Sequence, residues 1–259
     1  MVLNIGSRED FYFEIADGGN TEFEIIHKFG RNINVGTTAV PIATSGFYQV
    51  PTAAVTLEAI SSDANDTAAG TGARIITVLG LDGNFAEIEE DISMNGVSAS
   101  SATTNSFIRV FRAFVKESGT YASQTAGSHQ GDITIRASGG GATYATIDTV
   151  GFPRGQTQIA AYTVPAGKEA FVKNIFIHVD SNKSMNVLFF QRAKADDVSS
   201  PYAGVMRLIQ EFDGLTGQAD LFPSSPFGPF EEKTDIGFMA YLSSGTGAVS
   251  VDFEIIQSK

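Results

Sequence analysis

The densest group of side chains that could carry out chemistry is the acidic run Glu87–Asp91, in which Glu87, Glu89 and Asp91 are spaced two residues apart. On a β-strand this spacing places the three carboxylates on one face. A glycosidase needs two carboxyl groups about 5–9.5 Å apart within a cleft. Because an exposed strand supplies the distance but no cleft, we interpret the run as a solvated face. A β-sandwich hydrolase using these residues is kept as the last alternative.

Patterns that could bind a metal ion are weak. Asp63-Ala64-Asn65-Asp66-Thr67 resembles the start of a calcium loop, but Ala68 and Arg74 occupy the positions where an EF-hand needs Gly and Glu. His178 and Asp180 would share one face of a strand, where they could form an acid–base pair or hold a metal. We expect ordinary structural roles for these residues and leave open a looser calcium site in the 63–67 loop.

The chain carries no recognisable catalytic motif. It has no Gly-x-Ser-x-Gly nucleophile elbow, no phosphate-binding loop and no dinucleotide-binding fingerprint. It also has no Cys, which excludes a thiol nucleophile, a zinc ribbon and a disulfide scaffold. We therefore predict that the protein is not an enzyme and uses no cofactor and no metal.

Charge and hydropathy restrict the partners. The 259 residues include 17 Lys and Arg against 29 Asp and Glu, for a net charge of −12. Binding to duplex DNA or to an anionic membrane surface needs a basic face, so neither nucleic acid nor membrane is expected as a partner. The sequence shows no secretory signal and no apolar run near the ~18 residues of a membrane span. We expect a chain that is made as a soluble protein.

The elements that would position these residues are short strands. Apolar residues alternate with polar ones, most clearly where Val249, Val251, Phe253 and Ile255 would share a face. Turn dipeptides, Asp82-Gly83 and Asn95-Gly96 among them, separate the runs. Pro201–Phe212 fits a helix or a strand. We predict an all-β fold of tandem antiparallel β-sandwich (jelly-roll-like) units, with about fourteen or more strands at roughly 8–12-residue spacing.

The domain organisation follows from breaks in this pattern. Gly139-Gly140-Gly141 and the segment up to Gln156 suggest a boundary, which gives sandwich units at about 31–150 and 151–259. One long β-sandwich domain is the alternative. Residues 1–30 stand apart as an N-terminal arm or a first edge strand. The segment is rich in aromatic residues that we predict to form an interface, namely Phe11, Tyr12, Phe13, Phe23 and Phe29.

Several segments together suggest a family. They are Asp10–Ala16, Ile26–Asn32, Asn65–Arg74 followed by a strand and Gly80-Leu81-Asp82, Thr103–Arg109, Tyr162–Lys168, Phe190–Arg192, Gly228–Phe230 and Thr234–Phe238. In their order and combination, over most of the chain, they resemble virion structural proteins of tailed bacteriophages, marine podoviruses especially. The resemblance implies a non-enzymatic, oligomeric component of the particle and offers no catalytic residues.

The leading hypothesis is a capsid decoration or cement protein that stabilises the phage head by protein–protein contacts. The expected partners are further copies of the chain, with a trimer favoured, and the major capsid protein or other virion proteins. Its location would be the virion, after synthesis in the host cytoplasm. The alternative is a tail or fibre-type adhesion module that binds a host glycan.

Overall fold

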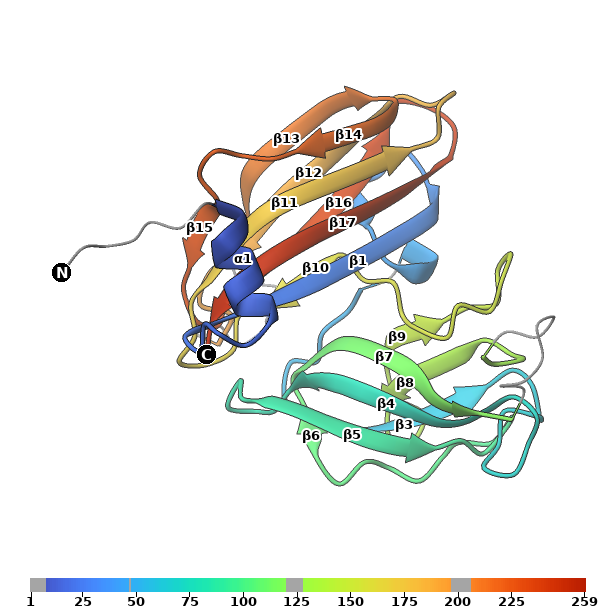
Figure 1. The fold of residues 1–259 in the computed structure, drawn as a ribbon. Coiled ribbons are helices and arrows are strands. Elements are labelled where there is room, and N and C mark those ends of the chain that lie inside the picture. The colour runs from blue at the N-terminus through green and yellow to red at the C-terminus, as the bar shows by residue number, and fades with distance from the viewer. Residues whose placement is uncertain (1–7, 47, 120–127, 197–205) are drawn as a thin grey trace.

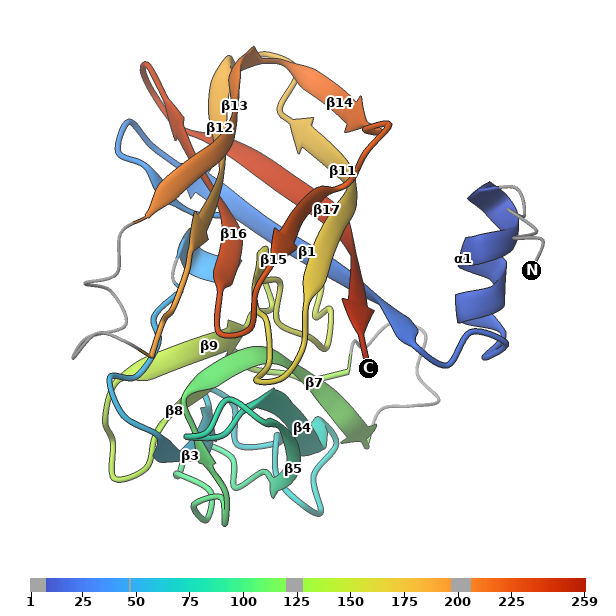
Figure 2. The ribbon, with the colours of Figure 1, turned by 90° about the vertical axis from the view of Figure 1, so that its left-hand side faces the viewer.

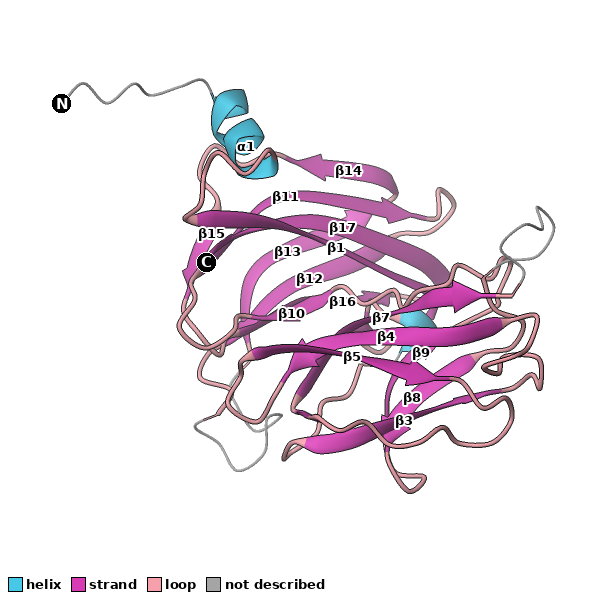
Figure 3. Cartoon of the chain, turned by 60° about the horizontal axis from the view of Figure 1, so that its bottom comes forward, coloured by secondary structure: helices cyan, strands magenta, loops and turns pink. Residues whose placement is uncertain are grey.

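The protein is built almost entirely from antiparallel strands. The computed structural model describes residues 8–46, 48–119, 128–196 and 206–259, and within these it forms 17 strands, one α-helix and one 3-10 turn (Thr44–Gly46) (Figure 1). Strands account for 54% of the chain and helix for 3%. The all-β prediction is confirmed. The strands form two sandwiches, one above the other in Figure 1 and again distinct in Figure 3.

The C-terminal sandwich has two five-stranded sheets. Its first sheet has the order β1-β17-β11-β14, with β15 also paired to β11; the bounds are β1 Phe23–Val35, β17 Gly247–Ser258, β11 Ala170–Val179, β14 Gly217–Leu221 and β15 Phe227–Phe230. Its second sheet has the order β10-β16-β12-β13, with β2 also paired to β16; the bounds are β10 Ala161–Thr163, β16 Asp235–Leu242, β12 Met185–Arg192, β13 Arg207–Leu215 and β2 Val40–Pro41. Between the sheets the rings of Phe189 and Phe238 stack with centroids 4.7 Å apart.

The middle sandwich is smaller. A four-stranded sheet has the order β6 (Ser106–Phe107), β3 (Val55–Ser61), β8 (Ile133–Ala137), β9 (Thr143–Ile147). It faces a three-stranded sheet of the order β5 (Glu87–Ser93), β4 (Ala73–Leu81), β7 (Arg109–Ser118). Buried aliphatic and aromatic side chains from both sheets, such as Leu57, Ile76 and Phe107, fill the space between them.

The period-two pattern explains which residues enter the cores. On β17 the predicted apolar face is buried, with Val249, Val251, Phe253 and Ile255 each at most 1% exposed. The polar residues between them point to the opposite face of the sheet. The alternation seen in the sequence is therefore the inward and outward alternation of real strands.

Strand pairing relates the expected domain limits to the fold. β1 crosses residue 31 and pairs with β17 along most of its length, so an N-terminal strand closes the C-terminal sandwich. The triplet Gly139–Gly141 is the turn of the β8–β9 hairpin, inside the middle sandwich. After β9 the chain leaves the middle sandwich and enters β10. The domain limits 1–30, 31–150 and 151–259 stay a prediction. β1 runs across the first boundary, between residues 30 and 31.

The N-terminal segment combines two elements. Residues Arg8–Ala16 form the helix α1, and β1 begins at Phe23. The sequence pattern does not predict α1, because its nine residues show no apolar stripe. Figure 2 shows α1 standing beside the C-terminal sandwich, on the side of β1 and β17. The Pro201–Phe212 segment lies partly outside the described residues, and its described part enters β13 at Arg207.

Candidate functional site

Polar groups converge where the two sandwiches meet. Arg109 of β7 is fully buried, and its Nε and Nη2 donate to Oδ1 (3.0 Å) and Oδ2 (3.1 Å) of Asp235 on β16. The hydroxyl of Thr163 donates to the same carboxylate at 2.6 Å. Two parallel bonds between charged groups make a strong and directional contact. Because β7 and β16 belong to different sandwiches, this ion pair joins them.

Lys28 on β1 also lies in the seam, which is the contact region between the two sandwiches. Its Nζ donates to the carbonyl of Phe111 at 2.8 Å and lies 5.9 Å from the centroid of that ring. Burial, and then the nearby charge of Arg112, lower the pKa of Lys28 to about 7. A lysine of this kind can act as a nucleophile or a base. Here the amine is held against a main-chain carbonyl, which indicates a structural group whose charge depends on pH.

A groove of about 350 Å³ runs along the seam and is lined by residues of β1, β4 and β7, with Glu87 of β5 and Tyr162 of β10. Lys168 lies between two carboxylates, with its Nζ donating to Glu24 (2.8 Å) and to Glu87 (2.6 Å). Burial alone would raise the pKa of Glu24, but hydrogen bonds from Lys168 and Gln257 outweigh it and lower that pKa. The phenol of Tyr162 donates to Gln257 at 2.7 Å. These groups bond mainly to one another, so the arrangement connects strands.

The acidic run lies on β5 with its three alternate acids exposed. Glu87 pairs with Lys168, as described. Asp91 pairs with Lys116 and accepts a hydrogen bond from Thr77 at 2.7 Å, and these contacts lower its pKa. Two of the three carboxylates are thus engaged in ion pairs, which favours the solvated-face interpretation.

The calcium-like loop is organised by an internal carboxylate. Asp66 is fully buried, and its Oδ1 accepts the N–H groups of Ala73 (2.7 Å) and Gln130 (3.0 Å). Its Oδ2 accepts the hydroxyl of Ser61 (2.6 Å) and the N–H of Gly131 (2.8 Å). Asp66 therefore fastens the 63–73 loop to the 128–131 segment by its own hydrogen bonds.

We expect Asp66→Asn to lower the free energy of unfolding by about 2–3 kcal/mol, because the new amide group turns a donor toward buried donors. Asp63→Asn is the matched control, since the partly exposed Asp63 carboxylate accepts a local N–H, that of Asn65, at 2.7 Å. Urea unfolding of both variants measures the difference. Calcium and a chelator should give the same thermal midpoint for the unaltered protein; a rise with calcium would contradict this role of Asp66.

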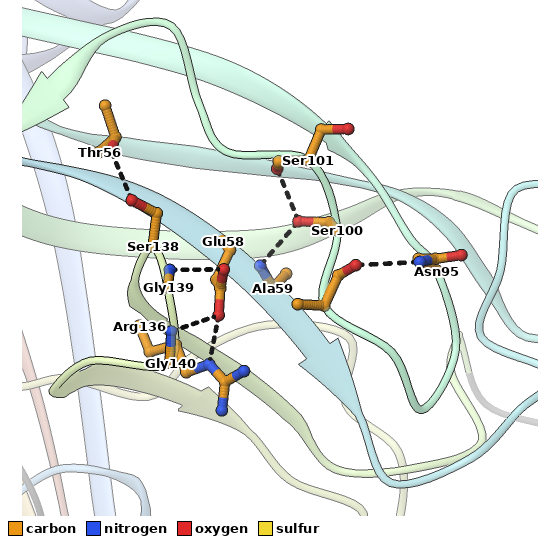
Figure 4. Close-up of polar contacts among 11 residues, drawn as sticks. Thr56, Glu58, Ala59, Asn95, Ser100, Ser101, Arg136, Ser138, Gly139 and Gly140 are labelled. Atoms are coloured by element: carbon orange, nitrogen blue, oxygen red, sulfur yellow. Dashed lines mark hydrogen bonds and ion pairs between the residues drawn. The ribbon is translucent and has the colours of Figure 1, made fainter.

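A second buried carboxylate shows what the glycine triplet does (Figure 4). Glu58 accepts the N–H groups of Gly139 (2.9 Å) and Gly140 (3.0 Å) and the Nε of Arg136 (2.7 Å). Burial alone would raise the pKa of Glu58, and these three donors lower it instead. Both glycines have positive φ, 80° and 78°, which turns their N–H groups toward the carboxylate. The Glu58 carboxylate is therefore the anion that holds the turn of the β8–β9 hairpin in place.

The structure gives His178 and Asp180 different roles. His178 is exposed on β11, whereas the carboxylate of Asp180 accepts the N–H of Ala248 at 2.9 Å. Over the described residues, no group of three or more His, Asp or Glu side chains is placed to hold a metal ion. Those same residues contain no helix that is long and apolar enough to cross a membrane.

The five aromatic residues predicted as an interface fall into three places. Phe11 meets Tyr12 and Phe23 edge to face, with centroids 5.9 and 6.1 Å apart, where α1 approaches β1. Phe13 is separate and 68% exposed. Phe29 lies further along β1, in a small recess shared with Phe176 and Asp252. The structure therefore brings three of the five together and leaves Phe13 projecting.

Comparisons with known proteins give little beyond this geometry. No protein-family model matches the chain, and no curated protein matches it. Among solved structures, that of infectious bursal disease virus, Gx strain, aligns at a TM-score of 0.22 and 10% identity, over 92% of this chain and 76% of that one. The VP2 subviral particle of the same virus aligns at 0.21 and 9%, over 96% and 82%. The chain thus shows weak structural similarity to a viral capsid protein, and its function has to be argued from its own residues.

Proposed function

We propose that this chain is a structural protein of a virus particle, and more narrowly a bacteriophage capsid decoration protein. The observation that carries the proposal is the helix α1. A nine-residue helix is marginal in water unless it packs against another surface. α1 packs on its own chain through the Phe11–Phe23 contact and through Ile15, which is 7% exposed, while Phe13 stays 68% exposed. Such a helix is suited to dock on a neighbouring protein.

The rest of the molecule fits a building block better than a catalyst. The convergent charged groups, Arg109 with Asp235 and Lys168 with its two glutamates, bond across the seam between the sandwiches. They hold the two units in one orientation, and a block of fixed shape can transmit force between neighbours. We accordingly propose no enzymatic activity.

The proposed mechanism is mechanical. α1 and the exposed apolar side chains form the centre of contacts with further copies, in a trimer, and with the major capsid protein, and polar residues form the rim. Buried apolar area then links neighbouring capsomers against internal pressure. The net charge of −12 suits a position on the outside of the shell, away from DNA.

Deletion of residues 1–20 tests this proposal. The deletion removes α1 but keeps Glu22, whose carbonyl accepts the N–H of Lys259, and all of β1. We expect the truncated chain to fold with a thermal midpoint lowered by about 2–4 °C, because the deletion removes the buried Ile15 and the Phe11–Phe23 contact but no strand of either sandwich. It should no longer bind phage heads that lack the protein, as measured by co-sedimentation.

Full binding by the truncated chain would contradict the docking role of α1. Copy number on the parent virion, from quantitative mass spectrometry, separates the decoration protein from a tail adhesion module. Hundreds of copies support decoration, and a handful would support the tail.

A further inference from the structure

We infer that Phe13 of one copy fills an apolar cavity in a second copy. This inference rests on the proposed function, and it identifies the surface on which α1 docks. The cavity measures about 170 Å³ and lies among β2, β10, β12 and β16. Its lining is mainly apolar, with Tyr48, Phe190, Met206 and Met239 among its residues, and it also contains the ion-paired Arg192 and Asp235.

The size of the cavity suits one aromatic ring. A cavity of about 150 Å³ lined by aliphatic and aromatic side chains is known to take up benzene. The two methionines in the lining can adjust their shape around a ring, because their side chains are unbranched. A phenylalanine side chain entering from outside would therefore find contact on most of its surface.

The donor of the ring is a second copy. In the chain itself, α1 stands outside the β1–β17–β11 sheet (Figures 1 and 2). The cavity is lined instead by strands of the opposite sheet, β10-β16-β12 with β2. Since helix and cavity belong to opposite sheets of the sandwich, the contact joins different copies. It uses two different surfaces, so repeated contacts of this kind form a ring such as a trimer when the rotation between copies closes, and an open filament when it does not.

Charge at the rim agrees with this pairing. Glu14 follows Phe13 on α1 and is exposed. Arg207 follows Met206 of the cavity lining and is exposed at the start of β13. With Phe13 inserted beside Met206, the two opposite charges become neighbours across the contact, where they would favour this register over others.

The absence of Cys allows a direct test by disulfide trapping. Phe13→Cys combined with Met239→Cys should give covalent oligomers of discrete size on a non-reducing gel after mild oxidation. Phe13→Cys combined with Phe222→Cys is the matched control, because Phe222 is 61% exposed and lies outside the cavity. Trapping in the control as strong as in the first pair would overturn the inference.

Sedimentation of purified protein gives the second readout. Phe13→Ser should weaken self-association about 10–100-fold, the effect of exposing one buried aromatic side chain, whereas Phe222→Ser should not. Glu14→Arg should also weaken association, and adding Arg207→Glu should restore it. A chain that stays monomeric, or an oligomer unaffected by Phe13→Ser, would overturn the inference. The decoration proposal would still stand in either case if deletion of residues 1–20 abolishes binding to heads.

Discussion

Replacing Arg109 with Met is expected to lower the free energy of unfolding by about 3–5 kcal/mol, because the change leaves the carboxylate of Asp235 without its main partner in the seam. Arg109 is 0% exposed and makes both hydrogen bonds of a forked ion pair with Asp235. It also donates to the carbonyl of Ile108 at 2.9 Å and lies 5.3 Å from the Phe85 ring. Urea unfolding followed by circular dichroism measures the loss.

Two further variants separate this effect from general damage. Arg109→Met with Asp235→Leu should recover part of the stability, because both charges of this pair are removed together. The recovery is not complete, because Arg192 Nη1 lies 3.6 Å from Asp235 Oδ2 and loses that carboxylate. Lys116→Met should have little effect, because Lys116 and Asp91 form an exposed pair. If Arg109→Met alone were as stable as the unaltered protein, the seam would not depend on this ion pair.

The stability of the protein is expected to rise with pH above neutrality because of Lys28. The pKa of Lys28 is about 7 in the folded chain, against 10.5 for an ordinary lysine. Between these values the unfolded chain holds one more proton than the folded chain. The free energy of unfolding therefore increases by about 1.4 kcal/mol per pH unit, or about 3 kcal/mol between pH 7 and pH 9.5.

Urea unfolding at several pH values measures this slope, and Lys28→Met should remove it. The same variant should be more stable than the unaltered protein at pH 7, because it no longer buries an ammonium group. Lys116→Met is again the control and should keep the slope. Measurements should stop near pH 9.5, because Tyr162, whose burial raises its pKa, and the paired lysines act in the opposite direction at higher pH. An unchanged slope in Lys28→Met would assign the effect to another group.

Much of the local structure could be predicted because it depends on neighbouring residues. Alternation over residues 249–255 predicted β17, and Asp82-Gly83 predicted the turn after β4, where Asp82 Oδ1 accepts the N–H groups of Asn84 and Ala86. The pairing of β1 with β17 could not be predicted in this way. It joins residues more than 200 positions apart, and alternation shows that a strand exists without naming its partner.

The candidate site was missed for a related reason. Lys28 and Arg109 both lie at buried positions of their strands, with buried Gly30 two residues after Lys28 and buried Phe111 two residues after Arg109. A charge within such an alternation is the signal that could have marked them. A charge at such a position must have a partner, but the partners come from other segments: Phe111 for Lys28 and Asp235 for Arg109. The acidic run on β5 is conspicuous in the sequence because its members are adjacent, although Glu87, Glu89 and Asp91 lie on an exposed face.

The amino-acid sequence by itself determined that the chain is all-β, where most strands and turns lie, and that its charge is strongly negative. Strands and turns depend on patterns within a few neighbouring residues, and the net charge is a sum over all residues. Tertiary structure decided the rest. It brought β1 to the C-terminal sandwich, buried Asp66 and Glu58 among main-chain donors, and joined the two sandwiches through Arg109 and Asp235. Those contacts depend on segments distant in sequence being placed within about 3 Å of one another, which only the packing of whole sheets can do.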